Sequence, residues 1–445
     1  MAQHTHPWCE YTSIRLMIPS TCHAPCNEKW LLRLVPAGLA VAITIGLSLA
    51  ALPDSGGAWR RVAIISGWAS SGLLATAMLL MVRLPRLSKL FGDLDNAYLW
   101  HHRCGAAAYL TLLLHPVALA MDAAQAAPGS GWTAISPAGG EWARWLGWAA
   151  LLGLMLGLMA TFALRLPYRI WRNAHWLLAF TVVGSVAHTL AYVGNHPAAL
   201  IFAGLCMLAL ALRFGSTVLA TNARRYQVVE AEQVATRVIE LRLRPKSRHI
   251  ALHPGQFVMA AFDANPAYRG CGEFHPFTAS EVSSDGSLKL AIKALGPCTR
   301  RIQGISPGAI ARLQGPFGGF LSCDRDRPQL WVAAGIGITP FVAALRAERC
   351  LVATELIYAF AERDSAAFVD KLSALADADP LLSLTRIEAA DASAAIKRRL
   401  DELHDLKDRA LQICGPADMV AWIASEARRR GVAAGNIHFE RFDFR

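Results

Sequence analysis

The sequence predicts a multi-domain protein: an all-α bundle of six transmembrane helices, then a small antiparallel β-barrel, then a Rossmann-like α/β domain. Three observations support this fold class. The 445 residues are 54% hydrophobic and only 17% charged, and nearly all of the apolar excess precedes residue 220. Short runs that alternate apolar and polar residues begin at Tyr226. From residue 327 onward, strand-like and helix-like segments alternate, which is typical of a parallel sheet.

Six segments are long and apolar enough to cross a bilayer, which requires about 20 mostly apolar residues. They are residues 30–52, 62–82, 97–121, 143–164, 174–193 and 197–214. Lys and Arg gather in the connections near 83–96, 165–173 and 213–226. The positive-inside rule therefore predicts an integral membrane protein with both termini in the cytoplasm.

These segments define four predicted regions. They are an N-terminal tail (1–29), a transmembrane domain (30–222), a barrel domain (223–326) and an α/β domain (327–445). The net charge of +11 lies mainly in the connections between spans. This placement favours the lipid bilayer as the partner of the basic residues and argues against a nucleic-acid partner.

The ten cysteines form no CxxC pair, so we predict unpaired buried thiols. The tail contains a group of metal-binding residue types, for which we favour an irregular solvated segment over a metal site: His4, His6, Cys9, Cys22, His23 and Cys26. The first apolar run leads straight into a spanning segment, so no cleavable signal peptide is expected.

Histidines within the predicted spans are the first candidate functional residues, because ionisable groups inside a membrane usually mark function. The third span contains His101 and His115, and the fifth contains His175 and His188. Each pair is separated by about 20 Å along its helix. Two facing helices with histidines at two matching depths can supply the axial ligands of two stacked haems. A bis-imidazole iron has no open position and suits electron transfer.

Helical phase leaves two questions open at these histidines. His102 competes with His101 for the inner site, although His101 shares the helix face of His115 to within about 40°. The step from His175 to His188 is one residue shorter and rotates the face by about 140°. We therefore expect a bulge, a kink or an oblique approach in the fifth span.

The barrel region contains candidate flavin contacts. Thr278 is placed to donate to a reactive flavin nitrogen, and Lys293, Thr299 and the amides after Gly296 are placed to bind a pyrophosphate. In the α/β region, a glycine turn joins a buried strand at 329–334 to an apolar helix. Such a turn lets a pyrophosphate approach the backbone and the positive end of the helix.

Further candidates follow the next two predicted strands, 355–360 and 410–414. Arg363 follows the first and is placed to pair with a 2′-phosphate, which favours NADPH, with NADH as the alternative. A Cys-Gly-Pro turn, Cys414 to Pro416, follows the second.

Together these motifs resemble the ferric reductase and NADPH oxidase superfamily over residues 30–445. The resemblance implies a ferredoxin-reductase-like module after the bundle. It also implies two b-type haems ligated by His101, His115, His175 and His188, and FAD bound at the His-Pro-Phe-Thr motif. Cys414 would lie beside the nicotinamide, and the ending Glu440-Arg-Phe442 would cover the flavin with an aromatic ring, Phe444 being the alternative. The resulting set of cofactor contacts is His275, Pro276, Phe277, Thr278, Lys293, Gly296, Thr299, Gly335, Gly337, Thr339, Pro340, Phe341, Arg363, Cys414, Gly415, Pro416, Glu440 and Phe442.

The family's chemistry implies that NAD(P)H passes a hydride to FAD, with Thr278, Cys414 and Phe442 serving this step. Single electrons then cross to the haems and reduce an acceptor outside, either dioxygen or ferric iron. Leu119 stands where animal oxidases have a further histidine near the oxygen site. The chain is therefore more similar to compact bacterial members, which implies the inner (plasma) membrane. The sequence identifies no protein partner.

Three other classes remain as alternatives. The chain would be an electron conduit if a partner protein took its electrons, or an anchored flavin reductase if it lacked haem. It would be a transporter if the histidines relayed protons. The absorption spectrum of the purified protein separates the last two from the predicted function.

Overall fold

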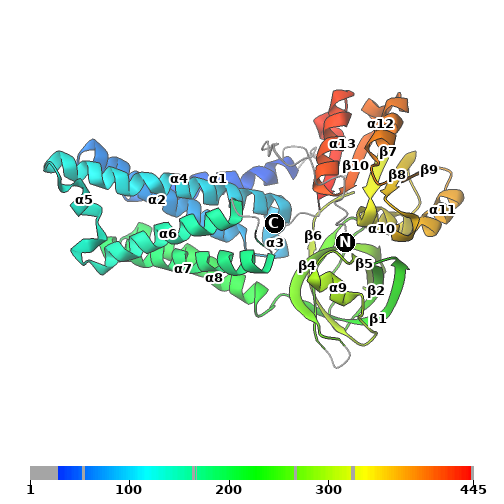
Figure 1. The fold of residues 1–445 in the computed structure, drawn as a ribbon, viewed down its shortest axis with the longest axis horizontal. Helices are drawn as coiled ribbons and strands as arrows, with labels where there is room; N and C mark the ends of the chain where they lie inside the picture. Colours follow the sequence, from blue (N-terminus) through cyan, green and yellow to red (C-terminus); the bar gives the residue numbers. More distant parts are fainter. Residues whose placement is uncertain are drawn as a thin grey trace, which may run out of the picture. The chain divides into compact units, whose positions relative to one another are not determined.

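The computed structural model describes residues 29–52, 56–162, 166, 168–264, 268–321 and 326–441. They form two compact units, a helical one at Leu31–Thr221 and a second one that begins at Asn222 (Figure 1). The predicted fold class is confirmed: six long apolar helices precede a closed antiparallel barrel and a parallel sheet covered by helices.

The helical unit contains six helices long and apolar enough to span a membrane. They are α1 (Lys29–Ala50), α2 (Ala58–Leu80), α4 (Leu94–Ala126), α6 (Trp142–Phe162), α7 (Tyr168–Val193) and α8 (Pro197–Thr217). The connections contain α3 (Pro85–Leu90), α5 (Ser130–Ile135) and η2 (Pro137–Gly139). Each predicted span corresponds to one helix. The polar ends of α4, which hold Asp95 and Asp122, explain why hydropathy alone predicted a shorter segment there.

The surface of this unit is apolar as well as its interior, as expected for helices that lie in a bilayer. Large apolar side chains point outward, among them Leu49, Leu110 and Phe180 at 62%, 65% and 73% exposure. Within the unit, α1, α2 and α4 lie in one layer and α6, α7 and α8 in another (Figure 1). An interior cluster that includes Trp68 of α2 and Phe202 of α8 joins the two layers.

The barrel closes through six strands in the order β1-β2-β5-β4-β3-β6. Their bounds are β1 (Arg224–Ala235), β2 (Val238–Pro245), β3 (Phe257–Phe262), β4 (Cys271–Val282), β5 (Leu288–Lys293) and β6 (Ile310–Phe317). Alternate residues point inward, as the sequence pattern predicts, and a short helix α9 (Pro297–Ile302) follows β5. The His275–Thr278 motif lies inside strand β4, where Thr278 pairs with Phe257 of β3.

The last domain is a parallel five-stranded sheet in the order β11-β10-β7-β8-β9. The strands are β7 (Gln329–Ala334), β8 (Thr354–Phe360), β9 (Leu382–Glu388), β10 (Ala410–Gly415) and β11 (Ile437–Arg441). The helices are α10 (Thr339–Ala347), α11 (Val369–Ala378), α12 (Ser393–Glu402) and α13 (Ala417–Arg429), with single turns η3 (Gly335–Ile338), η4 (Arg363–Ser365), η5 (Leu406–Asp408) and η6 (Ala434–Asn436). Because α10 and α11 cover one face and α12 and α13 the other, the domain is doubly wound.

Strands β9 and β11 were not predicted from the sequence. Strand β9 lies at the edge of the sheet, and much of it is exposed and polar, including Ser383, Thr385 and Arg386. An edge strand has no continuous apolar run to mark it. Strand β11 is only five residues long.

A buried ion network joins the barrel to helix α10. Glu240 of β2 accepts hydrogen bonds from Ser280 Oγ of β4 at 2.6 Å and from Arg346 Nη1 of α10 at 2.7 Å. Arg346 also donates to the Ser280 carbonyl at 3.0 Å, and Lys289 Nζ lies 3.8 Å from the Glu240 carboxylate. Burial by itself would raise the pKa of Glu240, but these donors and cations lower it. The network therefore holds an ionised carboxylate between two domains.

We expect Glu240→Gln to destabilise the second unit by up to roughly 3–5 kcal/mol, because Arg346 then keeps only its longer and more exposed pairing with Glu281, at 3.5 Å. The measurement is thermal unfolding of the full chain in detergent, followed by flavin fluorescence. Arg242→Met is the matched control on the same strand, since Arg242 pairs with Glu230 on a half-exposed surface and such pairs contribute about 1 kcal/mol or less. Equal losses in the two variants would contradict this account of the network.

Candidate functional site

Three of the four predicted haem-ligand histidines have the same anchoring contact. His101 Nδ1 lies 2.9 Å from the Ala77 carbonyl, His115 Nδ1 lies 2.8 Å from that of Ala63, and His188 Nδ1 lies 2.8 Å from that of Ala143. A carbonyl oxygen only accepts, so Nδ1 carries the proton in each ring. This leaves Nε2 as the nitrogen that can bind a metal, an arrangement common among metal-ligating histidines.

At the first depth, His101 of α4 faces His175 of α7 across the bundle. Their ring centroids are 6.0 Å apart. Two imidazoles bound to opposite sides of one iron, with bonds of about 2 Å, place their centroids at about this separation. Trp171 stacks on His175 at 5.1 Å, and Thr161 Oγ1 lies 3.4 Å from His175 Nδ1. These contacts fit a bis-imidazole site.

His102 was the competing candidate at this depth. Its ring lies 5.5 Å from that of His101 and 5.8 Å, edge-on, from that of Phe162. The carbonyl anchor and the close approach to His175 both belong to His101. The geometry therefore favours His101 as the ligand.

At the second depth, two glycines lie directly against the histidine rings. A Cβ on Gly67 of α2 would stand 2.9 Å from His115 Nδ1, and one on Gly147 of α6 would stand 2.6 Å from His188 Cε1. Real Cβ atoms do not approach other atoms so closely. The glycines thus provide the space in which each ring reaches its carbonyl partner on the neighbouring helix.

The described part of helix α7 accommodates the difference in helical phase between His175 and His188 without a change of helix type. Helix α7 is a single α-helix over its described length. His175 is oriented toward α4, while His188 is hydrogen-bonded to α6 and contacts Tyr192 edge-on. The orientation of the His188 ring is therefore set by its contact with the neighbouring helix α6.

In the second unit, strand β4 brings Thr278 to the C-terminal strand of the sheet. Thr278 is 4% exposed, and its Oγ1 donates to Glu440 Oε2 of β11 at 3.5 Å. Glu440 pairs in register with Cys414 of β10. Three of the predicted residues, from two domains, therefore gather at one place. Phe442 and Phe444 lie outside the described residues.

The predicted glycine turn and the Cys-Gly-Pro turn meet where the strand order reverses. Strands β7 and β10 are neighbours, and their connecting helices cover opposite faces, which is where doubly wound sheets bind ligands. A Cβ on Gly337 would stand 2.3 Å from the Cys414 carbonyl oxygen, so only glycine permits this contact. The turn after β7 is thus pressed against the end of β10.

The charges around these two turns favour binding of an anion and keep the nearby thiol neutral. Lys293 Nζ lies 3.7 Å from the position of a Cβ on Gly335, which places an ammonium group beside the glycine turn. Burial, together with Arg237, lowers the pKa of Lys293, and an anionic pyrophosphate would offset this cost. Burial and then the Glu440 carboxylate raise the pKa of Cys414 well above 9.0, so its thiol stays protonated. Cys414 therefore acts as a compact neutral group.

Several other predicted contacts are used within the protein. Thr299 Oγ1 accepts from the amides of Leu295 and Gly296, each at 2.9 Å, and so closes the turn before α9. Thr339 Oγ1 donates to the Ile336 carbonyl, and Phe341 is a core residue that stacks on Trp331. Pro340 is also buried, whereas Gly415 and Pro416 form the end of β10 and the start of α13.

Arg363 is paired with an acidic residue. Its guanidinium donates to Asp370 of α11, and its main-chain amide donates to Glu388 Oε1 at 2.9 Å. Both Arg363 and Asp370 are exposed, so this ion pair is weak and can exchange for a phosphate.

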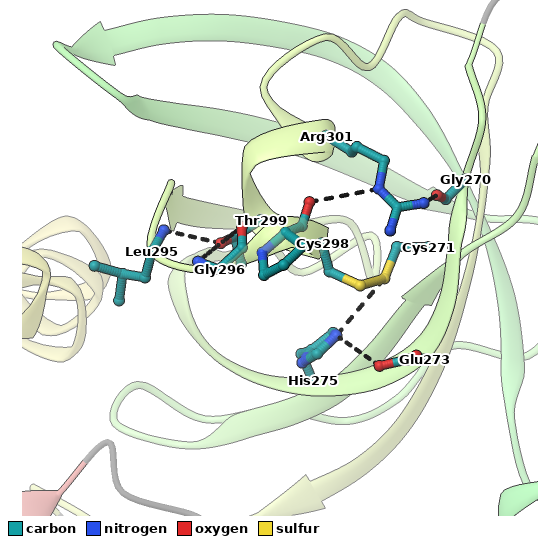
Figure 2. The surroundings of a disulfide bond; sticks show 10 residues. Gly270, Cys271, Glu273, His275, Leu295, Gly296, Cys298, Thr299 and Arg301 are labelled. Atoms are coloured by element: carbon teal, nitrogen blue, oxygen red, sulfur yellow. Dashed lines mark hydrogen bonds and ion pairs between the residues drawn. A yellow bond between two sulfur atoms is a disulfide. The ribbon is translucent and has the colours of Figure 1, made fainter. Parts of the chain in front are cut away.

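The prediction of unpaired cysteines is wrong at one place. Cys271 of β4 and Cys298 of α9 form a disulfide bond, which joins the strand of the His275–Thr278 motif to the helix after Gly296 (Figure 2). Elsewhere in the described chain, Cys104, Cys206, Cys350 and Cys414 are free. The pair is 27 residues apart, and cysteine spacing alone does not reveal such a pairing. Cys271 also lies 3.6 Å from His275 Nε2.

Sequence reasoning also missed Gly67, Gly147 and the pair Glu240–Arg346. The glycines look like ordinary small residues of apolar helices, and only the fold shows which ring each one faces. The spacing of Trp171 and His175, one helical turn apart, was an available signal for their stacking.

Comparison with known proteins identifies both units. Residues 66–196 match the family model of the ferric reductase like transmembrane component, and residues 223–310 match that of an FAD-binding domain. The chain is 31% identical over 230 residues to a probable dihydroorotate dehydrogenase B (NAD(+)) electron transfer subunit of Methanothermobacter thermautotrophicus, covering 48% of this chain and 75% of that protein. It is 36% identical over 129 residues to dual oxidase 1 of Rattus norvegicus, covering 27% of this chain and 8% of that protein.

Among solved structures, the flavohem-like FAD/NAD binding domain of nitric oxide dioxygenase from Vibrio cholerae is similar, with 18% identity and a TM-score of 0.43. The similarity covers 49% of this chain and 98% of that one.

The fold and these matches define an integral membrane NAD(P)H oxidoreductase that contains an FAD-binding domain. The chain belongs to the ferric reductase and NADPH oxidase superfamily.

We expect Gly147→Ala to lower the haem content of the purified protein by about half, because the new Cβ displaces His188 from its carbonyl anchor. Loss of a hydrogen bond that orients a metal-binding histidine typically weakens metal binding 10- to 100-fold, which is the basis of this estimate. Haem per chain is measured by the pyridine haemochrome assay. Gly105→Ala is the matched control, because no atom lies within 4 Å of its new Cβ. Unchanged haem in Gly147→Ala would exclude His188 as a ligand.

We expect Thr278→Val to slow flavin reduction by NADPH by about 10-fold, because loss of one hydroxyl contact in a reacting complex costs about 1.4 kcal/mol. Stopped-flow absorbance under nitrogen gives the rate constant. Thr278→Ser keeps the hydroxyl and should remain within about 2-fold of the parent, by the same conversion of energy to rate. Equal rates of flavin reduction in all three proteins would show that Thr278 does not contribute to hydride transfer.

Proposed function

We propose that the protein carries electrons from cytoplasmic NADPH through FAD and two b-type haems to an acceptor on the opposite side of the membrane. Dioxygen is the proposed acceptor, so the activity is that of a superoxide-forming NADPH oxidase. The observation that supports this proposal best is the histidine arrangement. Four histidines on two helices occupy two depths, and three of them hold Nδ1 against main-chain carbonyls.

The proposed inner haem is ligated by His101 and His175, and the outer haem by His115 and His188. Bound there, the two irons would supply one-electron relays with no open coordination position. The protein positions the imidazoles and fixes their protonation state. A haem spectrum would distinguish the proposal from a transporter, in which the same histidines would relay protons.

In the second unit, we propose that the crevice at β4, β7, β10 and β11 binds FAD and the nicotinamide nucleotide. FAD would accept a hydride and release single electrons. Thr278 provides a hydroxyl donor, and Lys293 provides positive charge beside the Gly335 turn, where the backbone of Gly335 and Gly337 is proposed to approach the pyrophosphate. The neutral Cys414 thiol is proposed to lie beside the nicotinamide, and Phe442 is proposed to cover the flavin.

NADPH is proposed over NADH because Arg363 follows β8, where a 2′-phosphate would lie. Glu388 is hydrogen-bonded to the same segment and is placed to accept from a 2′-hydroxyl, which keeps NADH as the alternative. The orientation, with both termini inside a bacterial-type inner membrane, rests on the basic connections between the spans.

Ferric-chelate reduction along the same path is the second candidate. The match of residues 66–196 to the ferric reductase like component favours it, whereas similarity to dual oxidases favours dioxygen. The experiment below distinguishes the two acceptors.

The test uses the full chain, purified in detergent and loaded with its cofactors. NADPH and NADH are compared as donors, first in air with cytochrome c as superoxide reporter and then under nitrogen with ferric citrate. We expect haem bands in the spectrum, faster haem reduction by NADPH, and cytochrome c reduction that superoxide dismutase abolishes. A red protein that reduces only ferric citrate establishes the second candidate. The absence of haem bands refutes the proposed path and leaves an anchored flavin reductase.

A further inference from the structure

The residues around the disulfide form a cluster of soft-metal ligand types. Cys271, Glu273 and His275 alternate along β4, so their side chains share one face of the strand, and Cys298 approaches from α9 (Figure 2). The ligand atoms of Cys271, His275 and Cys298 all lie within 4.8 Å of one another. Two elements far apart in sequence thus direct two sulfur atoms and an imidazole to one point.

The distance from sulfur to imidazole suits a tetrahedral cation, whereas the two sulfur atoms are bonded to each other and would have to separate to about 3.8 Å on reduction. A Zn²⁺ ion with bonds of about 2.3 Å to sulfur and about 2.0 Å to nitrogen separates those two ligand atoms by about 3.5 Å. Cys271 Sγ and His275 Nε2 are 3.6 Å apart. Glu273 Oε2 lies 4.0 Å from His275 Nε2 on the same side of the strand, but its carboxylate is not among the ligand atoms that all lie within 4.8 Å of one another.

The cluster is also partly enclosed and has a nearby cation. Cys271 is 4% exposed and Cys298 is 7% exposed. The Arg301 guanidinium lies beside Cys271, where it donates to the Gly270 carbonyl at 3.3 Å (Figure 2).

We propose that Cys271, His275 and Cys298 form a binding site for one soft divalent cation of the Zn²⁺ class when the two cysteines are reduced. The disulfide and the metal site are then two states of the same residues. A dithiol or phosphine reductant supplies two electrons, two protons complete the two thiols, and the reductant is oxidised. The cation then binds both sulfurs and releases the two thiol protons.

A cytoplasmic location would keep Cys271 and Cys298 largely reduced. This inference rests on the proposed function in one respect, namely that the second unit faces the cytoplasm. Disulfides are rare there, and cysteine clusters in cytoplasmic enzymes more often bind metals. A bound cation would keep β4 joined to α9 without the disulfide, and it would engage His275, the first residue of the predicted flavin motif.

Zinc binding is tested on the full chain with its cofactors in place. A background variant, Cys9→Ser/Cys22→Ser/Cys26→Ser, removes the competing cysteines of the tail. The protein is reduced with a phosphine under nitrogen, exposed to Zn²⁺ and desalted. Elemental analysis gives Zn per chain, and X-ray absorption at the zinc edge identifies its ligands without interference from haem or flavin.

We expect one Zn²⁺ per reduced chain, with two sulfur ligands at about 2.3 Å. Oxidation with diamide before Zn²⁺ is added should abolish binding. Cys298→Ser should weaken the affinity by more than the roughly 100-fold that loss of an outer-shell partner costs. Cys350→Ser is the control, since Cys350 is a free cysteine in the same unit but outside the cluster.

The proposal is overturned if the reduced chain binds no zinc, if oxidised and reduced chains bind equally, or if the ligands are oxygen and nitrogen only. The comparison of oxidised with reduced protein needs no substitution within the cluster. It therefore remains a valid test even if Cys298→Ser does not fold. Haem spectra and NADPH-driven haem reduction are recorded on the same samples. Their loss with intact zinc binding would refute the proposed function and leave the metal site standing.

Discussion

Hydrogen bonds from imidazole rings to main-chain carbonyls organise the transmembrane unit. In hydrocarbon, a ring nitrogen without a partner is costly, and the carbonyls of a helix are normally used by its own amides. The α4 rings bond to carbonyls of α2, and His188 bonds to one of α6. Each contact fixes the rotation of one helix against its neighbour and selects the tautomer that leaves Nε2 for a metal. Helix packing and ligand orientation therefore have a common cause.

The second unit depends on a different constraint, the reversal of strand order between β7 and β10. At this reversal the barrel brings Thr278 to Glu440 of β11 and Lys293 to the Gly335 turn after β7. A site built from both domains requires them to keep a fixed orientation relative to each other. The buried ion pair of Glu240 and Arg346 stabilises this orientation, because separating the domains would leave each charge buried without its partner.

The sequence predicted the order and class of the domains because composition and periodicity are averaged over many residues. It predicted the spans for the same reason, and it brought His101, Thr278 and Cys414 to attention through their motifs. The rest depends on contacts between distant segments. Nothing local shows that Gly147 faces His188, that Cys271 meets Cys298, or that Thr299 uses its hydroxyl within its own turn. The edge strand β9 was missed because half of it faces water.

The carbonyl anchors have a consequence for biogenesis. Helices α2 and α4 form one pair, and α6 and α7 form another, each already holding at least one histidine in position. Membrane proteins assemble by association of helices that are independently stable in the bilayer. Each pair can therefore form as the chain leaves the insertion machinery, before any cofactor arrives.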